Sequence, residues 1–183
     1  KIQIGIIGSA GSEEYPRKGG ATKRLIKIAE EIGFLLAKKG IIVVTGGKGG
    51  IMEAAAKGAK KGGGITVGVI KEGERFTSNN FTDVEVISGM VRGGSEFIQA
   101  LTCDALIIIG GGAGTLEEIA IAYQNNKPLI ALGKAGGWSE KLAGKYLDER
   151  KIVKIKIAKT PKEAVEKAIS LAKRDLTHNS HSL

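Results

Sequence analysis

The sequence is poor in the residues that form disulfides, metal sites and aromatic stacking surfaces. Its 183 residues include one cysteine and two histidines, and aromatic side chains amount to 4%. A lone cysteine cannot form an intramolecular disulfide, so Cys103 fits a reducing compartment, and its apolar flanks disfavour a catalytic thiol. His178 and His181 lie in a polar terminal stretch without metal-ligand spacing, and we expect no metal site.

A long apolar run is also missing. No stretch approaches the roughly 20 apolar residues that cross a membrane, and residues 1–7 do not form a signal-peptide pattern. We therefore expect a soluble, cytoplasmic protein with no membrane partner. Hydrophobic residues make up 42% and charged residues 26% of the chain, which is an ordinary balance for one folded domain of 183 residues.

Glycine and positive charge are abundant. The 28 glycines are about twice the average share, so they need a local explanation. Lysine and arginine outnumber aspartate and glutamate by 28 to 19, and the net charge of +9 favours a phosphate, a nucleic acid or an acidic partner. Many lysines are dispersed, as at Lys141, Lys145 and Lys151, which is typical of a solvated surface rather than one binding patch.

Short apolar runs alternate with helical patterns along the chain. The runs are rich in Ile and Val on both faces, as expected for parallel strands covered by helices. Strands are predicted over residues 2–7, 41–44, 65–70, 84–87, 105–109, 129–132 and 152–157. Helices are predicted over residues 25–39, 52–60, 95–101, 116–123 and 164–173, the last opened by a capping box at 160–163.

This alternation predicts an α/β fold. We expect a single Rossmann-like doubly wound domain over residues 1–176, with a mainly parallel sheet of about seven strands flanked by helices. Residues 177–183 are predicted to form a flexible C-terminal tail. Residues 71–83 lack apolar periodicity and predict a mobile loop, which in this fold is either a lid over the ligand-binding edge or a plain connection.

Three predicted strands run directly into glycine-rich turns, which begin at Gly8, Gly46 and Gly110. Glycines at the end of a strand let the backbone approach a phosphate, and a helix that follows aims N–H groups and its positive dipole end at the anion. Tight turns favour glycine in any case, but three such turns together predict a phosphate site. Its predicted ligand-binding residues are Gly8, Ser9, Gly46, Gly47, Lys48, Gly49, Gly50, Gly111, Gly112, Gly114 and Thr115.

Two common phosphate-binding motifs do not fit these turns. A Walker loop requires Ser or Thr after Gly-Lys, but Lys48 is followed by Gly49, which disfavours a P-loop ATPase. A dinucleotide fingerprint requires Gly-x-Gly-x-x-Gly after the first strand and an acidic residue at the end of the second. The first turn has only Gly8 and Gly11, and the second strand ends in Thr45, so ordinary NAD binding is not expected.

The run Gly-Gly-Gly-Ala-Gly-Thr-Leu-Glu-Glu at residues 110–118 resembles the Pro-Gly-Gly-x-Gly-Thr-x-x-Glu signature of the LONELY GUY or lysine-decarboxylase-like superfamily, with Gly110 in place of the proline. The resemblance covers residues 2–132, and Asn79-Asn80-Phe81 and Ile87-Ser88-Gly89-Met90 look closer to the molybdenum cofactor carrier branch. It implies a nucleoside monophosphate or a molybdopterin-type cofactor as the bound ligand, and a homo-oligomer, either a dimer or a tetramer.

The same resemblance implies candidate catalytic residues. The family's enzymes hydrolyse cytokinin riboside monophosphates, with an arginine and the last glutamate of the signature acting at the ribose. Glu118 matches the glutamate, whereas Ser95 stands where the enzymes carry the arginine, and Arg92 lies three residues earlier. Glu118 and Arg92 are thus the catalytic candidates, and Met90, Ser95 and Glu118 are expected to contact the ligand. Nothing in the sequence specifies a pyridoxal-binding lysine.

Three of these residues have a second interpretation. Thr115 and Glu118 have capping-box spacing, so Glu118 either caps its own helix, binds ribose or takes part in catalysis. Ser95 either caps the helix that follows it or contacts the ligand. Lys48 either pairs with phosphate or is simply exposed.

The sequence therefore predicts a binding or carrier protein for a phosphorylated nucleotide-like ligand. A nucleoside 5'-monophosphate phosphoribohydrolase is the first alternative, because Glu118 is present. A nucleic-acid-binding Rossmann protein is the second, prompted by the charge of +9 and a distant likeness to DNA-processing proteins. Single-strand binders usually stack bases on aromatic side chains, of which this chain has few, and this disfavours the nucleic-acid alternative.

Overall fold

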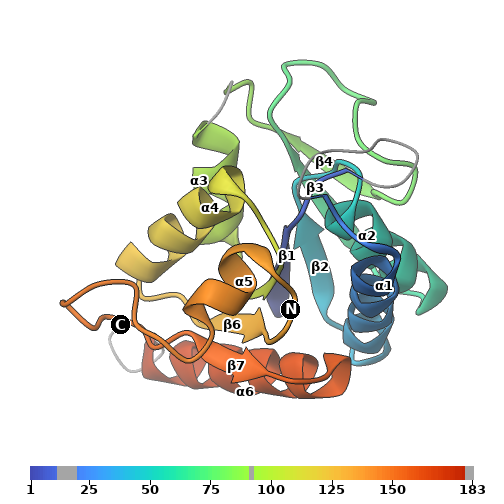
Figure 1. The fold of residues 1–183 in the computed structure, drawn as a ribbon. Coiled ribbons are helices and arrows are strands. Elements are labelled where there is room, and N and C mark those ends of the chain that lie inside the picture. Colours follow the sequence, from blue (N-terminus) through green and yellow to red (C-terminus); the bar gives the residue numbers. More distant parts are fainter. Residues whose placement is uncertain (12–19, 91–92, 180–183) are drawn as a thin grey trace.

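The fold is built on one sheet of seven parallel strands (Figure 1). A computed structural model describes residues 1–11, 20–90 and 93–179, with side chains up to residue 174. The strands are β1 (Gln3–Gly8), β2 (Ile42–Thr45), β3 (Thr66–Ile70), β4 (Val84–Ile87), β5 (Ala105–Ile109), β6 (Leu129–Leu132) and β7 (Lys156–Ala158). They lie in the order β4-β3-β2-β1-β5-β6-β7, and every pairing is parallel.

The central strands are apolar on both faces, which places them inside the sheet. All five residues of β5 are buried, and Ile7 of β1 pairs with Ile108 of β5. Strand β4 lies at one edge and alternates in exposure, with Val84 and Val86 on its open face. The sequence pattern thus follows position in the sheet, since only strands covered on both sides are apolar throughout.

Helices cover both faces of this sheet (Figure 1). One apolar cluster joins the sheet to α1 (Lys23–Lys38), α2 (Ile51–Lys61) and α6 (Pro161–Asn179). A second cluster, on the opposite face, joins it to α3 (Gly94–Thr102), α4 (Ala113–Gln124) and α5 (Gly137–Leu142). The predicted α/β doubly wound fold is therefore confirmed. Within the described residues, no helix is both long and apolar enough to cross a bilayer.

Helices α1 and α2 approach each other so closely that glycine is required at the contact. A Cβ atom placed on Gly58 would lie 1.8 Å from the backbone oxygen of Glu30, and one placed on Gly33 would lie 1.9 Å from that of Ala55. Each glycine therefore packs against the backbone of the opposite helix. This contact fixes α2, whose first residues form part of the site described below.

Most predicted strand boundaries agree with the structure to within one residue, but the last strand is displaced. The prediction was residues 152–157, whereas β7 is Lys156–Ala158. The residues before it pair with the preceding loop instead, because the Gly144 amide donates to Ile155 O at 2.9 Å and the Ile155 amide donates to Lys145 O at 2.8 Å.

Three helices also differ from the prediction. Helix α4 begins at Ala113, three residues earlier than expected, because its first three residues are alanine, glycine and threonine, which show no apolar periodicity. Helix α5 has only six residues and was not predicted. Helix α6 continues to Asn179, past the predicted end at 173 and into the predicted tail 177–183, because no glycine or proline interrupts it.

Candidate functional site

A cavity of about 890 Å³ opens at the carboxyl ends of the strands. It lies where the strand order reverses between β1 and β5, which is where doubly wound folds bind ligands. The turns after β1, β2 and β5 line it, together with the loop after β3 and parts of α2, α3 and α4. Its volume suits a ligand of nucleotide size.

Helix α4 begins in this cavity with unpaired backbone amides. Its N-cap, Gly112, provides no side-chain acceptor, and the amides of Ala113, Gly114 and Thr115 have no acceptor in the described part of the chain. The Thr115 hydroxyl does not cap the helix either, since it donates to Gly8 O at 3.2 Å. These amides and the positive end of the helix dipole suit an anion in the cavity.

The turn that leads into α4 depends on glycine. Gly110 and Gly111 have φ angles of +68° and +102°, which residues with side chains rarely adopt. Proline cannot adopt the first of these angles, so the backbone here departs from the proline-containing signature that the sequence resembles. The Gly111 amide donates to the Ser9 hydroxyl oxygen at 2.9 Å, which ties this turn to the one after β1.

Helix α2 begins in the same way. Its N-cap, Gly50, has a φ of +78° and no capping side chain, and a Cβ there would lie 2.6 Å from Ser9 O. The Ile51 amide donates to Ser9 O at 3.1 Å, whereas the amides of Met52 and Glu53 have no acceptor within residues 1–11, 20–90 and 93–179. A second set of unpaired helix amides therefore lines the cavity.

The first glycine turn differs from the other two. Helix α1 begins only at Lys23, and Thr22 caps it by accepting from the Leu25 amide at 3.3 Å. A helix N-terminus therefore follows directly on the turns after β2 and β5, whereas α1 begins two residues before its predicted start at residue 25. Gly8 and Ser9 still line the cavity, where they contribute backbone wall rather than a helix end.

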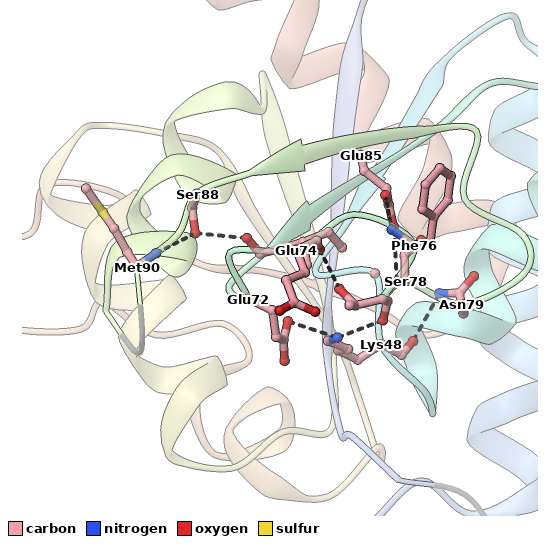
Figure 2. Close-up of polar contacts among 12 residues, drawn as sticks. Lys48, Glu72, Glu74, Phe76, Ser78, Asn79, Glu85, Ser88 and Met90 are labelled. Carbon is pink, nitrogen blue, oxygen red and sulfur yellow. Dashed lines mark hydrogen bonds and ion pairs between the residues drawn. The ribbon is translucent and has the colours of Figure 1, made fainter.

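Lys48 is tied to the loop after β3 (Figure 2). Its Nζ atom lies 2.9 Å from Glu72 Oε2 and donates to Thr77 O at 2.8 Å. Burial raises the pKa of Glu72, but the hydrogen bond from Lys48, a backbone hydrogen bond and the charges of Lys48 and Lys71 together outweigh this effect and bring the pKa below its ordinary value. Glu72 is therefore ionised at neutral pH and already neutralises much of the Lys48 charge.

The loop after β3 is fixed on both sides (Figure 2). Toward the cavity, the Asn79 amide donates to Gly47 O at 2.7 Å. Toward β4, Glu85 accepts from the amides of Phe76 and Ser78 at 2.7 and 3.1 Å. The loop thus forms part of the cavity wall, held against the second glycine turn.

Helix α3 brings three polar side chains to the cavity: Ser95, Glu96 and Gln99. Glu96 accepts from the Gly93 amide at 3.0 Å and from the Ser95 hydroxyl at 2.6 Å. Gly93 is the N-cap, so Ser95 is not the cap of this helix and points its hydroxyl at Glu96 instead. Gln99 is 2% exposed, and its Nε2 atom has no acceptor among the residues that the structure describes.

Glu118, in the second turn of α4, is a neutral carboxylic acid at physiological pH. Burial, and to a smaller extent the negative charges of Glu96 and Glu117, raise its pKa to about 8. At pH 7 about 90% of a group with that pKa is protonated. The capping interpretation is wrong, because the helix begins at Ala113 and its cap position is Gly112.

The cavity brings most of the predicted ligand-binding residues together. Those that line it are Gly8, Ser9, Gly46, Gly47, Lys48, Gly49, Ser95, Gly112, Gly114, Thr115 and Glu118. Gly50 and Gly111 support the turns without lining the cavity. Met90 lies outside it, 53% exposed, with its amide donating to the Ser88 hydroxyl oxygen. Arg92, the other catalytic candidate, falls outside the described residues.

Sequence reasoning missed the polar residues that α3 and the β3 loop contribute. Gln99 had a usable signal, because Ser95 and Gln99 are four residues apart and therefore share one face of an otherwise apolar helix. Glu72 had none, because its pairing with Lys48 depends on how the loop folds back. The sequence predicted one carboxyl group at the site, that of Glu118, whereas Glu53, Glu72 and Glu96 also line the cavity.

Comparison with known sequences finds relatives over most of the chain. Residues 1–165 match the SLOG cluster4 family. A protein of Archaeoglobus fulgidus is 37% identical over 131 residues, which cover 72% of this chain and 80% of that protein. A cytokinin riboside 5'-monophosphate phosphoribohydrolase of Mycobacterium tuberculosis is 29% identical over 143 residues, which cover 73% of this chain and 76% of the enzyme.

Solved structures share the fold over nearly its whole length. The molybdenum cofactor binding protein of Rippkaea orientalis superposes with a TM-score of 0.76 at 30% identity, covering 96% of this chain and 98% of that one. The molybdenum cofactor carrier protein of Chlamydomonas reinhardtii superposes with a TM-score of 0.72 at 28% identity, covering 94% and 99%.

Proposed function

We propose that this chain, which belongs to the SLOG cluster4 family, binds and carries a phosphorylated nucleotide-like ligand. Its membership agrees with the sequence resemblance to the LONELY GUY superfamily, near the molybdenum cofactor carriers. One observation carries the proposal: α2 and α4 both begin in the cavity without a capping side chain. Their unpaired amides suit a phosphate. The remaining volume suits the sugar and ring of a nucleoside monophosphate or a molybdopterin-type cofactor.

In this proposal the phosphate is held chiefly by backbone amides. Lys48 is already paired with Glu72, and the other lysine that lines the cavity is Lys71. The lining also contains the carboxyl side chains of Glu53 and Glu96. Side-chain charge therefore contributes little positive potential at the site, whereas the two helix N-termini contribute it in fixed positions.

The lining favours holding the ligand over cleaving it. None of the described residues that line the cavity is an arginine, and Ser95, at the arginine position of the enzymes, is bonded to Glu96. Cleavage of a glycosidic bond develops positive charge at the sugar, which a carboxylate stabilises. A protonated Glu118 lacks that negative charge at neutral pH.

A phosphoribohydrolase is the second candidate, and the pKa of Glu118 favours it. A carboxylic acid with a pKa of about 8 is suited to protonate a leaving base at neutral pH, because general acids work best with a pKa near the operating pH. The relative from Mycobacterium tuberculosis carries the name of this activity. In this alternative Glu118 is the general acid, with the phosphate on the same helix amides.

Equilibrium titration with AMP, GMP and molybdopterin separates the two candidates when each mixture is also assayed for released base. The carrier proposal expects saturable binding of at least one ligand with the base still attached. Absence of saturable binding to every phosphorylated ligand would remove the proposal. Release of free adenine from AMP that stops in Glu118→Gln would establish the hydrolase instead, and release that persists unchanged in Glu118→Gln would exclude Glu118 as its acid.

We also propose that the protein is a homo-oligomer, either a dimer or a tetramer. Phe97 on α3 and Val84 on the edge strand β4 are large apolar side chains with about half of their surface exposed, at 49% and 48%. In this proposal these two side chains contact another copy of the chain. Sedimentation equilibrium measures the mass directly, and a monomer at all concentrations would contradict this proposal.

A further inference from the structure

Gln99 is a buried polar residue whose Nε2 atom has no partner in the part of the chain that the structure describes. It lies on α3, lines the cavity and is only 2% exposed. Its Nε2 atom is shielded from bulk water and has no hydrogen-bond acceptor within the described portion of the chain. Buried amide groups are nearly always paired in folded proteins, because leaving the group unpaired costs the free energy of its lost hydration. This amide is therefore left unsatisfied by the arrangement of side chains that the structure describes.

Gln99 packs close to the turn after β2, beside apolar walls of the cavity. A Cβ placed on Gly46 would lie 3.4 Å from Gln99 Oε1 and 2.9 Å from Met52 Sδ, so only glycine lets these two side chains lie against the backbone here. Met52 and Val69 provide apolar surface on the lining of the same cavity. Apolar walls around a few fixed polar groups are typical of sites that bind heterocycles.

A carboxamide offers a donor beside an acceptor. It therefore complements a heterocycle edge on which an acceptor lies beside a donor, as in the lactam of guanine or a pterin and in the amidine of adenine. We propose that Gln99 recognises the ring of the bound ligand, and that on binding its carboxamide turns about its last side-chain bond so that Nε2–H enters the cavity and donates to a ring oxygen or ring nitrogen. This inference rests on the proposed function, in which the helix amides hold the phosphate and Gln99 selects what the phosphate carries.

The test compares ligands with and without the ring. Ribose 5-phosphate contains the phosphate and sugar alone, whereas AMP, GMP and molybdopterin add a heterocycle. Gln99→Met removes the donor and acceptor at nearly constant length, and Gln99→Glu keeps an acceptor oxygen but loses the amide donor. Gln124→Met is the matched control, since Gln124 is exposed at the end of α4 and does not line the cavity.

In the unmodified protein the tightest ring-bearing ligand should bind at least about tenfold more tightly than ribose 5-phosphate. Gln99→Met and Gln99→Glu should remove about tenfold of that affinity, as expected for one hydrogen bond to a buried group. Affinity for ribose 5-phosphate should be unchanged in every variant. Without ligand, Gln99→Met should melt at the same or a higher temperature, because an unpaired buried amide has been replaced by an apolar group.

Two results would overturn the inference about Gln99 alone. One is ring-bearing ligands that bind no more tightly than ribose 5-phosphate. The other is Gln99→Met retaining full affinity for them. If neither ribose 5-phosphate nor any ring-bearing ligand binds the unmodified protein, the proposed function fails as a whole, and the role of Gln99 fails with it.

Discussion

Replacing Glu118 by glutamine tests the site most sharply through the pH dependence of stability. The native state holds a proton on Glu118 up to a pKa of about 8, whereas the unfolded chain releases it near the ordinary value of 4.5. Between these two values the native state binds more protons than the unfolded state, so the free energy of unfolding falls as pH rises. Glu118→Gln keeps the shape of the neutral acid and cannot ionise, so it lacks this loss.

The size of the effect follows from the separation of the two pKa values. At about 1.4 kcal/mol for each pKa unit, a carboxyl sealed from water would lose nearly 5 kcal/mol between pH 4.5 and 8. Burial and the neighbouring charges of Glu96 and Glu117 cause this shift, and water in the open cavity reduces its effect on stability, so we expect a loss of about 3–5 kcal/mol. The variant and the unmodified protein should be nearly equal in stability at pH 5, and the variant more stable at pH 9.

Urea denaturation at intervals from pH 5 to pH 9 measures this difference directly. Glu166→Gln makes the same chemical change on the exposed surface of α6 and serves as the control, with a profile parallel to that of the unmodified protein. Parallel profiles for Glu118→Gln and the unmodified protein over the whole range would refute the reasoning, because they would mean that Glu118 ionises equally easily in both states.

Two further predictions concern the loop after β3 and the contact between α1 and α2. Lys48→Met removes the ion pair with Glu72 and the hydrogen bond to Thr77 O, so the loop after β3 should open more often. We therefore expect trypsin to cleave after Arg75 about fivefold faster in this variant. The exposed Lys27→Met is the control and should be cleaved there at the unmodified rate. Gly58→Ala inserts a methyl group against the backbone of α1 and should lower the melting temperature by about 4–10 °C in calorimetry. An unchanged melting temperature would contradict that close contact.

The sheet and the glycine turns were predictable because they depend on local sequence. Strands such as Ala105–Ile109 are apolar throughout, and a doubly wound fold places all their carboxyl ends at one edge. Glycine at positions such as Gly47 and Gly50 marks turns where φ is positive. The location of the cavity followed from these two facts alone.

The rest of the site was not predictable because it depends on contacts between distant segments. The charge of Lys48 cannot be interpreted without Glu72, which lies on the next loop. The neutral state of Glu118 arises from burial and from Glu96 on another helix, neither of which the signature reveals. The unpaired amide of Gln99 becomes visible only when every neighbouring acceptor has been placed.

The central claim is that a phosphate binds the amides at the N-termini of α4 and α2. The most direct test is a titration of isotope-labelled protein with ribose 5-phosphate, followed through amide resonances in nuclear magnetic resonance, with ribose as the control. We expect the Gly114, Thr115 and Met52 amides to shift saturably with ribose 5-phosphate and to stay in place with ribose. Shifts confined to other regions, or none at all, would contradict the account.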